Sequence, residues 1–199
     1  MIVAVEGPSA AGKSTWCRRH AGRFVADYAP TGKEPADAAA LARYWTRVAA
    51  RRWAAAVDLE RTDGVGICDS DPVKLHHAWG MAVLGLAPRA AFDRELAVTR
   101  EAFRSGRLGL ADAVLIGLPE IDVLRARRDG DPARQRRDFA AQVQLREPIE
   151  AWYRAVDRLD PGRVIWELPA GGLPKLPDPR TDRTSVDLLD ALVDELPAP

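Results

Sequence analysis

Cysteine, net charge and long apolar runs are all scarce in this chain. Its 199 residues include two cysteines, too few for the disulfide framework of a small secreted domain. The 29 basic and 29 acidic side chains cancel, which disfavours a broad electrostatic surface for a nucleic acid polymer. No segment approaches the roughly 18 apolar residues that span a bilayer, and residues 1–6 lack the basic leader of a secretory signal. We therefore expect a cytoplasmic protein that binds neither membranes nor nucleic acid polymers.

Lysine is scarce as well. Four of the 29 basic residues are lysines, so the other 25 are arginines, a bias that a GC-rich genome explains without any function. A motif that requires a lysine is therefore a more specific signal here than in an average chain. With 47% hydrophobic residues, the chain is long enough to bury a substantial core, and we expect one domain over residues 1–199.

Short apolar runs that end at turn residues alternate with segments of helical spacing. The runs predict five strands, at 2–6, 23–27, 64–68, 113–118 and 163–168. The segments between and after them predict helices at 13–20, 35–60, 73–84, 89–105, 121–128, 133–159 and 184–196. Strands that alternate with helices favour a parallel sheet covered on both faces. The sequence therefore predicts a three-layer α/β/α fold around a five-stranded parallel sheet.

Residues 7–14 read Gly-Pro-Ser-Ala-Ala-Gly-Lys-Ser and fit the spacing Gly-x4-Gly-Lys-Ser/Thr of a phosphate-binding P-loop. Glycines allow the tight turn in which successive N–H groups point at one anion. Lys13 adds a positive charge for the β- and γ-phosphates, and the Ser14 hydroxyl is a ligand for Mg²⁺. The following helix contributes the positive end of its dipole. We expect ATP and Mg²⁺ to bind here, through Gly7, Ala10, Ala11, Gly12, Lys13, Ser14 and Thr15.

Several classes of P-loop protein are excluded by motifs that the chain lacks. No lysine lies in the Asn-Lys-x-Asp context by which GTPases read guanine, and no Leu-Ser-Gly-Gly signature of transporter ATPases occurs. AAA-type ATPases end a strand with Asp-Glu, whereas here the pair occurs only at 194–195, in the last expected helix. A small phosphotransferase is the class that remains.

In its P-loop, in the Asp-containing end of the third expected strand and in residues 118–128, the chain resembles the nucleoside and nucleotide kinases, particularly thymidylate and deoxynucleoside kinases. The resemblance covers residues 1–168 in the order and spacing of elements. It implies an ATP-dependent kinase whose small-molecule acceptor binds under the helices between strands two and four. Nucleosides and nucleotides are the leading acceptor class, and a homodimer is compatible with the sequence.

Six arginines fall within thirteen residues around the break Asp-Gly-Asp-Pro at 129–132: Arg125, Arg127, Arg128, Arg134, Arg136 and Arg137. Guanidinium groups on a closing segment stabilise the charge of phosphoryl transfer while the segment excludes water. The resemblance aligns Arg125 and Arg128 best with the lid arginines of the family, and the lid is expected over about 125–138. A solvated charged helix is the alternative.

Carboxylates follow the second and third expected strands. Asp27 ends strand two, where deoxynucleoside kinases place a carboxylate that orients or deprotonates the acceptor hydroxyl, although an ordinary turn cap is the alternative. Of Asp69 and Asp71, we expect Asp69 to hold Mg²⁺ or to orient the acceptor, because Asp71-Pro72 also fits a simple helix start. The predicted catalytic residues are therefore Lys13, Asp27, Asp69, Arg125 and Arg128, and the predicted metal ligands are Ser14 and Asp69.

Ser70 departs from the families that the chain resembles. Thymidylate kinases carry Asp-Arg after strand three and deoxynucleoside kinases carry Glu-Arg-Ser, so that Ser70 stands in the place of the arginine. The departure keeps two alternatives open: a P-loop kinase for a non-nucleotide metabolite or antibiotic, and a non-catalytic nucleotide-binding regulatory protein. Intact Lys13, Ser14 and lid arginines favour a kinase over the regulatory protein.

The base of ATP is expected along the sheet edge, bordered by residues 125–137 and the loop 169–183. Arg128 or Arg183 would cover its ring face. Because backbone contacts discriminate adenine from guanine only modestly, we expect ATP as donor, with GTP partly accepted.

The remaining aromatic, histidine and cysteine side chains have weaker signals. His76 and His77 point about 100° apart on a helix, so at most one is expected to face the site. Cys17 and Cys68 have no metal-ligand spacing and are expected in the core. Three tryptophans, Trp45, Trp53 and Trp79, are expected in the core rather than as stacking platforms.

Overall fold

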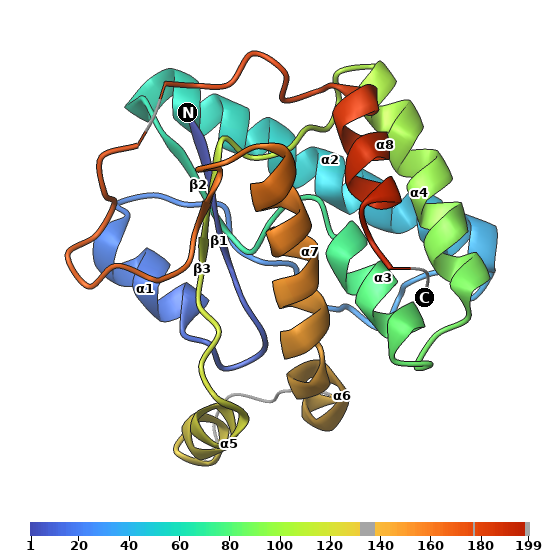
Figure 1. Ribbon diagram of the computed structural model, residues 1–199, viewed down its shortest axis with the longest axis horizontal. Helices are drawn as coiled ribbons and strands as arrows, with labels where there is room; N and C mark the ends of the chain where they lie inside the picture. The colour runs from blue at the N-terminus through green and yellow to red at the C-terminus, as the bar shows by residue number, and fades with distance from the viewer. Residues whose placement is uncertain (132–137, 177, 198–199) are drawn as a thin grey trace.

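The computed structural model describes residues 1–131, 138–176 and 178–197 (Figure 1). Within them the strands are β1 (Ile2–Glu6), β2 (Gly66–Asp69), β3 (Ala113–Ile116) and β4 (Val164–Ile165). The helices are α1 (Lys13–His20), α2 (Ala38–Asp63), α3 (Leu75–Val83), α4 (Arg89–Arg104), α5 (Ile121–Asp129), α6 (Phe139–Gln144), α7 (Arg146–Leu159) and α8 (Val186–Asp194). All strand pairs are parallel, in the order β2-β1-β3-β4. The α/β class with a parallel sheet is confirmed.

The sheet of the described residues has four strands, not the five expected. The missing one is the segment 23–27, which makes a single bridge at Val25: its N–H donates to Ile67 O and its carbonyl accepts from Asp69 N, each at 2.8 Å. Arg23, two residues earlier, points to solvent, where its guanidinium pairs with Asp63. With one residue anchored, the segment runs along the edge of β2 without forming a ladder.

The predicted helix 133–159 is also wrong in its extent. Two helices, α6 and α7, occupy its described part, and Leu145 separates them. Pro148 gives the physical reason, since it has no N–H to donate to Gln144 and is tolerated only in the first turn of a helix. Residues 132–137 lie outside the described part of the chain, and with them the predicted lid arginines Arg134, Arg136 and Arg137.

The two faces of the sheet carry unequal layers. Alternate residues of β1 point to opposite faces: Val3 and Val5 pack with Trp16 of α1, while Ile2 and Ala4 belong to the larger core. Figure 1 shows α1 alone on one side of the sheet and α2, α3, α4, α7 and α8 on the other. The larger core therefore has two shells of helices, with α4 and α8 outermost.

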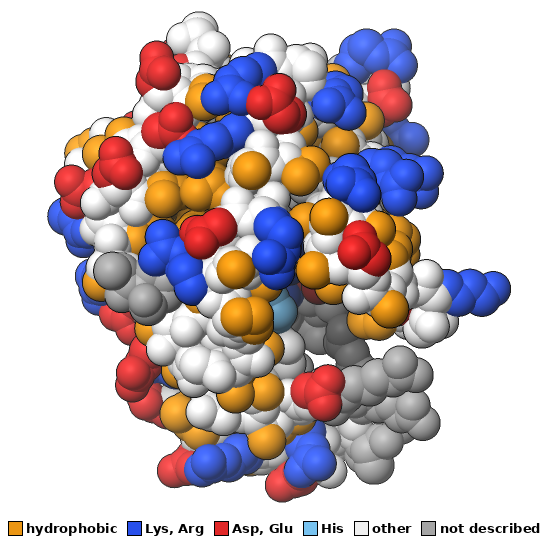
Figure 2. All heavy atoms as spheres, turned by 90° about the vertical axis from the view of Figure 1, so that its right-hand side faces the viewer, with side chains coloured by type: hydrophobic (Ala, Val, Ile, Leu, Met, Phe, Trp, Pro, Cys, Tyr) orange, Lys and Arg blue, Asp and Glu red, His pale blue; other side chains and the backbone are white. Residues whose placement is uncertain are grey.

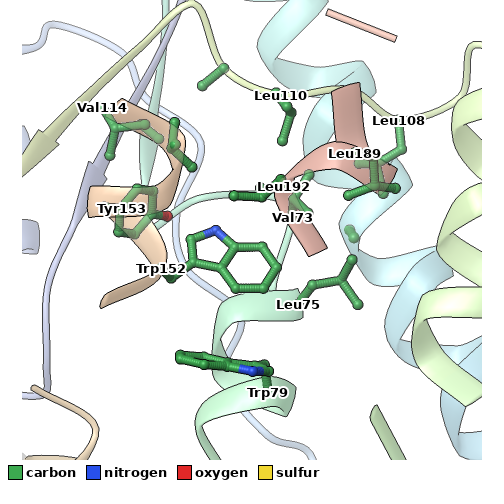
Figure 3. Close-up of a cluster of buried hydrophobic side chains, with 14 of the residues drawn as sticks. Val73, Leu75, Trp79, Leu108, Leu110, Val114, Trp152, Tyr153, Leu189 and Leu192 are labelled. Atoms are coloured by element: carbon green, nitrogen blue, oxygen red, sulfur yellow. The ribbon is translucent and has the colours of Figure 1, made fainter. Parts of the chain in front are cut away.

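Tryptophans dominate the larger core (Figure 3). Trp79 of α3 and Trp152 of α7 are each 2% exposed, and their rings lie 6.1 Å apart. Burial of such a side chain contributes on the order of 4 kcal/mol at about 25 cal/mol per Å². Trp53 is buried as predicted, whereas Trp45 is only half-buried and touches Tyr28 and Tyr44.

Both cysteines lie in the core as predicted. Burial, with nearby Asp69 and Cys68, raises the pKa of the Cys17 thiol to about 12. Burial raises the pKa of the Cys68 thiol to about 12 as well. Neither thiol is therefore a nucleophile at neutral pH.

The surface shows no field of one sign on the face drawn in Figure 2, where basic and acidic side chains alternate between apolar ones. This mixture fits the zero formal charge of the whole chain. Among the described residues, no helix has both the length and the apolar character to cross a membrane.

Candidate functional site

A cleft of about 680 Å³ opens where β1 ends. The P-loop and the first turn of α1 form one part of its lining, and Asp27, Lys74, His76 and His77 form another. Residues from α5, α6 and α7 complete it. Ligands of open parallel α/β sheets bind outside the carboxyl ends of the strands, at the point where the strand order reverses. In the order β2-β1-β3-β4 that point lies between β1 and β3.

The P-loop depends on positive φ angles at three residues. Gly7 has φ 147°, Ala10 has φ 67° and Gly12 has φ 102°. A Cβ at Gly7 would lie 2.2 Å from the carbonyl oxygen of Gly117, so that only glycine fits beside the end of β3. Ala10 adopts a left-handed conformation that costs a non-glycine residue energy, and such residues gather at binding sites.

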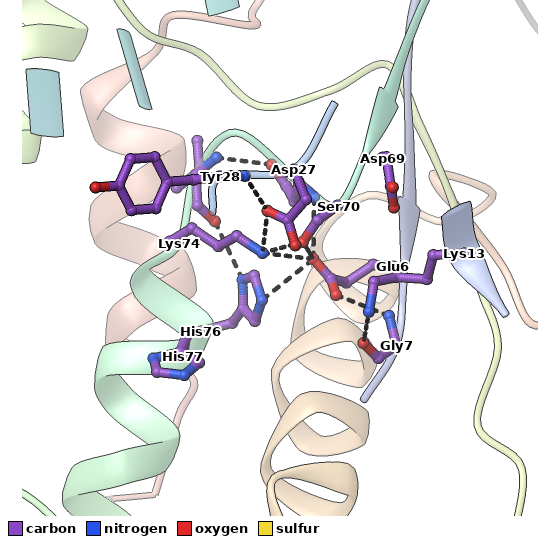
Figure 4. A network of polar contacts seen from close by, with 12 residues as sticks. Glu6, Gly7, Lys13, Asp27, Tyr28, Asp69, Ser70, Lys74, His76 and His77 are labelled. Atoms are coloured by element: carbon purple, nitrogen blue, oxygen red, sulfur yellow. Dashed lines mark hydrogen bonds and ion pairs between the residues drawn. The ribbon is translucent and has the colours of Figure 1, made fainter. Parts of the chain in front are cut away.

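Lys13 arches back over this loop. Its Nζ donates to Gly7 O at 2.6 Å and to Pro8 O at 3.1 Å (Figure 4). The ammonium therefore lies beside the turn of the loop, next to the N-terminus of α1. Positive charge is concentrated at the place where the sequence predicts phosphates.

Arg127 of α5 is the arginine that reaches the P-loop. Its Nη1 donates to Ala11 O at 2.9 Å and to Ala10 O at 3.4 Å, whereas Arg125 pairs with Asp122 at 3.1 Å in solvent. The buried Leu124 marks the inner face of α5. Helical spacing places Arg127 next to that face and turns Arg125 away from it.

Arg128 likewise does not reach the loop. It pairs with Asp129 at 3.1 Å, and its guanidinium lies 5.4 Å from the ring centre of Phe139. Sequence reasoning named Arg125 and Arg128 for the lid; of the three arginines of α5, Arg127 is the one that contacts the P-loop. Arg127 and Arg128 both flank Leu124, so spacing alone does not decide between them.

Glu6, the last residue of β1, is a buried carboxylate that sequence reasoning missed. It is 2% exposed and accepts hydrogen bonds from Gly7 N, Ser70 Oγ and Asp71 N at 2.8–2.9 Å. Burial alone would raise its pKa, but the charges of Lys74, His76 and Lys13 hold the pKa of Glu6 well below its usual value. The available signal was a charged residue inside an apolar strand, directly before Gly7.

Asp27 lies beside the same network (Figure 4). Its Oδ1 is 3.6 Å from Lys74 Nζ and 4.0 Å from Arg52 Nη1, and it accepts from Tyr28 N at 2.9 Å. Although burial opposes the charge of Lys74, the nearby Asp27 and Glu6 raise the pKa of Lys74 above its usual value. The structure thus brings Asp27 to the cleft, together with a cation that the sequence analysis did not assign.

Arg52 of α2 fixes the turn that follows β2. Its guanidinium donates to the carbonyl oxygens of Asp69, Ser70 and Asp71 at 2.6–3.1 Å, and to that of Ala26 at 3.1 Å. Ser70 in this turn has φ 73°. One buried arginine therefore joins the segment before Asp27 to the end of β2. Sequence reasoning missed it because arginine is so common in this chain.

Asp69 and Asp71 differ in how their oxygens are satisfied. Asp71 accepts from Val73 N and from Tyr153 Oη, each at 2.9 Å, and burial raises its pKa. Asp69 is 4% exposed, and its Oδ1 has no hydrogen-bond partner among the described residues. Asp71 is thus a structural group, and Asp69 keeps an unpartnered oxygen.

Asp69 and Ser14 fit a magnesium ion by their chemistry. The carboxylate of Asp69 and the hydroxyl of Ser14 are hard oxygen donors, which Mg²⁺ takes together with water and phosphate oxygens. The unpartnered Oδ1 of Asp69 supports this fit, although Asp69 is not among the residues that line the cleft.

His76 and His77 both line the cleft, although their helical angle suggested that only one would. His76 is buried, with Nε2 3.3 Å from Glu6 Oε2 and Nδ1 3.1 Å from Val73 O. Burial, then the charges of Lys74 and His76, lower the pKa of His77 to about 4. His77 is therefore neutral at neutral pH, and its Nε2 lies 3.2 Å from Gln142 Nε2 of α6. The cleft spans enough of α3 to include both rings.

The loop after β4 borders the cleft as predicted, but Arg183 does not. Leu168 and Ala170 line the cleft, and Trp16 Nε1 donates to Pro169 O at 2.8 Å. Arg183 instead donates to Glu60 and Asp112 at 2.6–2.8 Å. Asp112 precedes β3, at the opposite edge of the sheet, so the prediction that Arg183 covers a nucleotide base is not met.

Comparisons with known proteins support the fold. No protein-family model matches the chain, and no curated protein matches it. A structure of deoxyadenosine kinase from M. mycoides with bound dATP matches with TM-score 0.52 and 15% identity, over 84% of this chain and 91% of that one. A second structure of that kinase, with bound dCTP, matches with TM-score 0.52 and 12% identity, over 98% and 100%. The chain has a nucleoside-kinase-like P-loop fold.

Proposed function

We propose that the protein is an ATP- and Mg²⁺-dependent kinase for a small molecule, with nucleosides and nucleotides as the leading acceptor class. One observation carries the proposal: a single cleft joins a P-loop that holds Lys13 to a carboxylate, Asp27, on another part of its lining. The similar deoxyadenosine kinase structures, with dATP and dCTP bound, favour this acceptor class.

The donor side of the cleft would bind the triphosphate of ATP. The backbone N–H groups of 7–14 and the dipole of α1 favour an anion here. Lys13 Nζ would exchange its contacts with Gly7 O and Pro8 O for phosphate oxygens. Arg127, already at the loop, would bind the transferring group as a planar donor.

The acceptor side would handle the hydroxyl proton. As the hydroxyl oxygen bonds to the γ-phosphorus and the bond to ADP breaks, the Asp27 carboxylate accepts the proton. A bound Mg²⁺, held by Ser14 and Asp69, would neutralise phosphate charge and orient the phosphates. A phosphate acceptor would need no such base, so that Asp27 favours a hydroxyl.

The decisive experiment is a coupled ADP-release screen with nucleosides, nucleotides and aminoglycoside-like alcohols as acceptors. Turnover with a nucleoside or nucleotide supports the proposal. Turnover with the alcohols alone would identify a P-loop kinase for a non-nucleotide metabolite or antibiotic. If ATP binds tightly but none of the acceptor classes causes ADP release, the regulatory protein is favoured. ATP and GTP compared as donors test the expectation that GTP is partly accepted.

Lys13→Ala is the matched test of the P-loop. Because Lys13 serves the phosphates, its loss should lower turnover by about 100-fold or more, while circular dichroism and thermal unfolding stay unchanged. Lys175→Ala, which changes a lysine outside the cleft lining, is the control. Unchanged turnover in Lys13→Ala would remove the kinase proposal.

A further inference from the structure

Lys74 joins three oxygen-bearing side chains from three separate segments of the chain. It occupies the N-cap position of α3, where its side chain makes no capping hydrogen bond. Its Nζ lies 3.6 Å from Glu6 Oε2 and 3.6 Å from Asp27 Oδ1, and it donates a hydrogen bond to Ser70 Oγ (Figure 4). An ammonium has three N–H donors. One of them is used in the hydrogen bond to Ser70 Oγ, and the two carboxylates neutralise the ammonium as ion pairs at 3.6 Å.

The two carboxylates that share this ammonium are held very differently. Glu6 is buried, and three further hydrogen bonds fix it. The side chain of Asp27 is 37% exposed. Glu6 is thus the rigid anchor of the ammonium, and Asp27 is the group whose position the ammonium controls.

The contacts of Asp27 leave one oxygen for the cleft. Within the described part of the chain, its hydrogen bond from Tyr28 N and its ion pairs with Lys74 and Arg52 all involve Oδ1. Oδ2 is then available to a hydroxyl in the cleft that Asp27 lines. Without the ammonium, the charges of Glu6 and Asp27 would repel each other.

We infer that Lys74 is a positioning residue, which holds Oδ1 of Asp27 so that Oδ2 meets the acceptor hydroxyl. The inference rests on the proposed function. Ser70 contributes through its size, because a short side chain leaves room for the ammonium between Glu6 and Asp27. Lys74 acts on turnover through Asp27 and not through ATP.

The test compares Lys74→Met and Lys74→Gln, which remove the charge, with Lys33→Met, which changes an exposed lysine in the loop after Asp27. A folded Lys74 variant should lose kcat by about 10- to 100-fold, since misplacement of a reacting group by about 1 Å costs this much. The KM for ATP should stay within about twofold of wild type. Lys33→Met should match wild type in both constants. Undiminished kcat, or a KM for ATP that rises in parallel with the loss, would overturn the inference.

A double-mutant cycle with Asp27→Asn separates positioning from a general structural effect. If Lys74 acts through Asp27, adding Lys74→Met to Asp27→Asn should lower kcat by less than about threefold further. Losses that multiply in the double variant would show that the two residues act independently, which contradicts the inference.

The same cycle measured by unfolding does not depend on turnover. An ion pair between Lys74 and Asp27 predicts non-additive changes in the unfolding equilibrium constant. Absence of turnover in the wild type with every acceptor would remove the proposed function, even where this coupling is found. If the effects of the two substitutions on the unfolding constant are additive, Lys74 and Asp27 do not interact. The inference is then contradicted, even where the wild type is an active kinase.

Discussion

At the scale of single residues, Asp27 and Asp69 have different surroundings. Removing the charge of each should therefore have a different effect on the kinetics. Asp27 shares a cation with Glu6 at the cleft, whereas Asp69 is buried with an unpartnered oxygen. Asp27→Asn should lower kcat by about 100-fold or more at saturating ATP and Mg²⁺, as expected for loss of a general base. Asp69→Asn should instead raise the Mg²⁺ concentration needed for half-maximal turnover.

Magnesium titrations of wild type and both variants check this prediction. Asp63→Asn, on the exposed end of α2, serves as the control. Superimposable titrations for wild type and Asp69→Asn would show that Asp69 does not support the metal.

Glu95 of α4 is a second residue whose surroundings predict a measurable effect. Burial raises the pKa of its carboxyl from 4.5 to about 7. Between these two values the folded protein keeps a proton that the unfolded chain releases, so this group lowers the free energy of unfolding as pH rises through the window. The full loss of stability from the ionised Glu95 carboxylate is present above about pH 7. Glu95→Gln should therefore stabilise the protein at about pH 8 by on the order of 2 kcal/mol, and should have little effect near pH 4.

Denaturant unfolding at several pH values measures this difference. Glu101→Gln, on an exposed position of the same helix, should change the stability by less than about 1 kcal/mol at each pH. A Glu95→Gln variant that is less stable than wild type at about pH 8 would mean that Glu95 makes a favourable contact as a carboxylate.

At the scale of elements, the contact between α2 and β2 depends on Gly66. A Cβ at this residue would lie 2.1 Å from the carbonyl oxygen of Ala56, on the buried face of α2. Backbone on both sides must shift to admit a methyl group, so Gly66→Ala should destabilise the protein by about 1–3 kcal/mol. A Cβ at Gly22 would meet no atom within 4 Å, and Gly22→Ala should stay within about 0.5 kcal/mol of wild type. Equal midpoints in denaturant unfolding of the two variants would show that Gly66 does not pack closely against Ala56.

The elements also show how far local pattern predicts structure. The positions of α1, α3, α4 and α5 follow the predicted segments closely, because helical spacing and turn residues are local signals. The segment 23–27 has the composition of a strand, yet it pairs at Val25 alone. Whether this segment pairs with β2 depends on the path of the loops on either side of it. The local sequence pattern does not predict that path.

At the scale of the whole molecule, Arg183 connects the C-terminal segment to the edge of the sheet opposite the cleft. It binds Glu60 of α2 and the fully buried Asp112, which also accepts from Ile2 N at 2.6 Å. Loss of one partner leaves a buried charge uncompensated, so Arg183→Ala should destabilise the protein by about 3 kcal/mol or more. The KM for ATP should not change, because Arg183 lies outside the lining of the cleft.

Thermal unfolding and ATP kinetics of Arg183→Ala test both parts of this prediction. Arg125→Ala, whose exposed pair with Asp122 contributes little, is the stability control. A raised KM for ATP at unchanged stability would indicate that Arg183 contacts the nucleotide, which contradicts its position outside the cleft.

The sequence by itself determined the P-loop, the α/β class and the order of most elements. These features follow from spacing over a few residues: two glycines and Lys13 in one loop, and apolar periods of helices and strands. Asp27 was also within reach of the sequence, because it ends a strand-like run before a turn.

Only the tertiary structure decided which partners the individual arginines have. With 25 arginines in the chain, neither composition nor spacing singles out Arg127 for the P-loop, Arg52 for the turn after β2, or Arg183 for the far edge. Long side chains reach partners on elements that are distant in sequence, so their roles follow from packing. Glu6 and Lys74 meet Asp27 for the same reason: parallel strands bring their carboxyl ends to one edge, and that edge forms only when the sheet does.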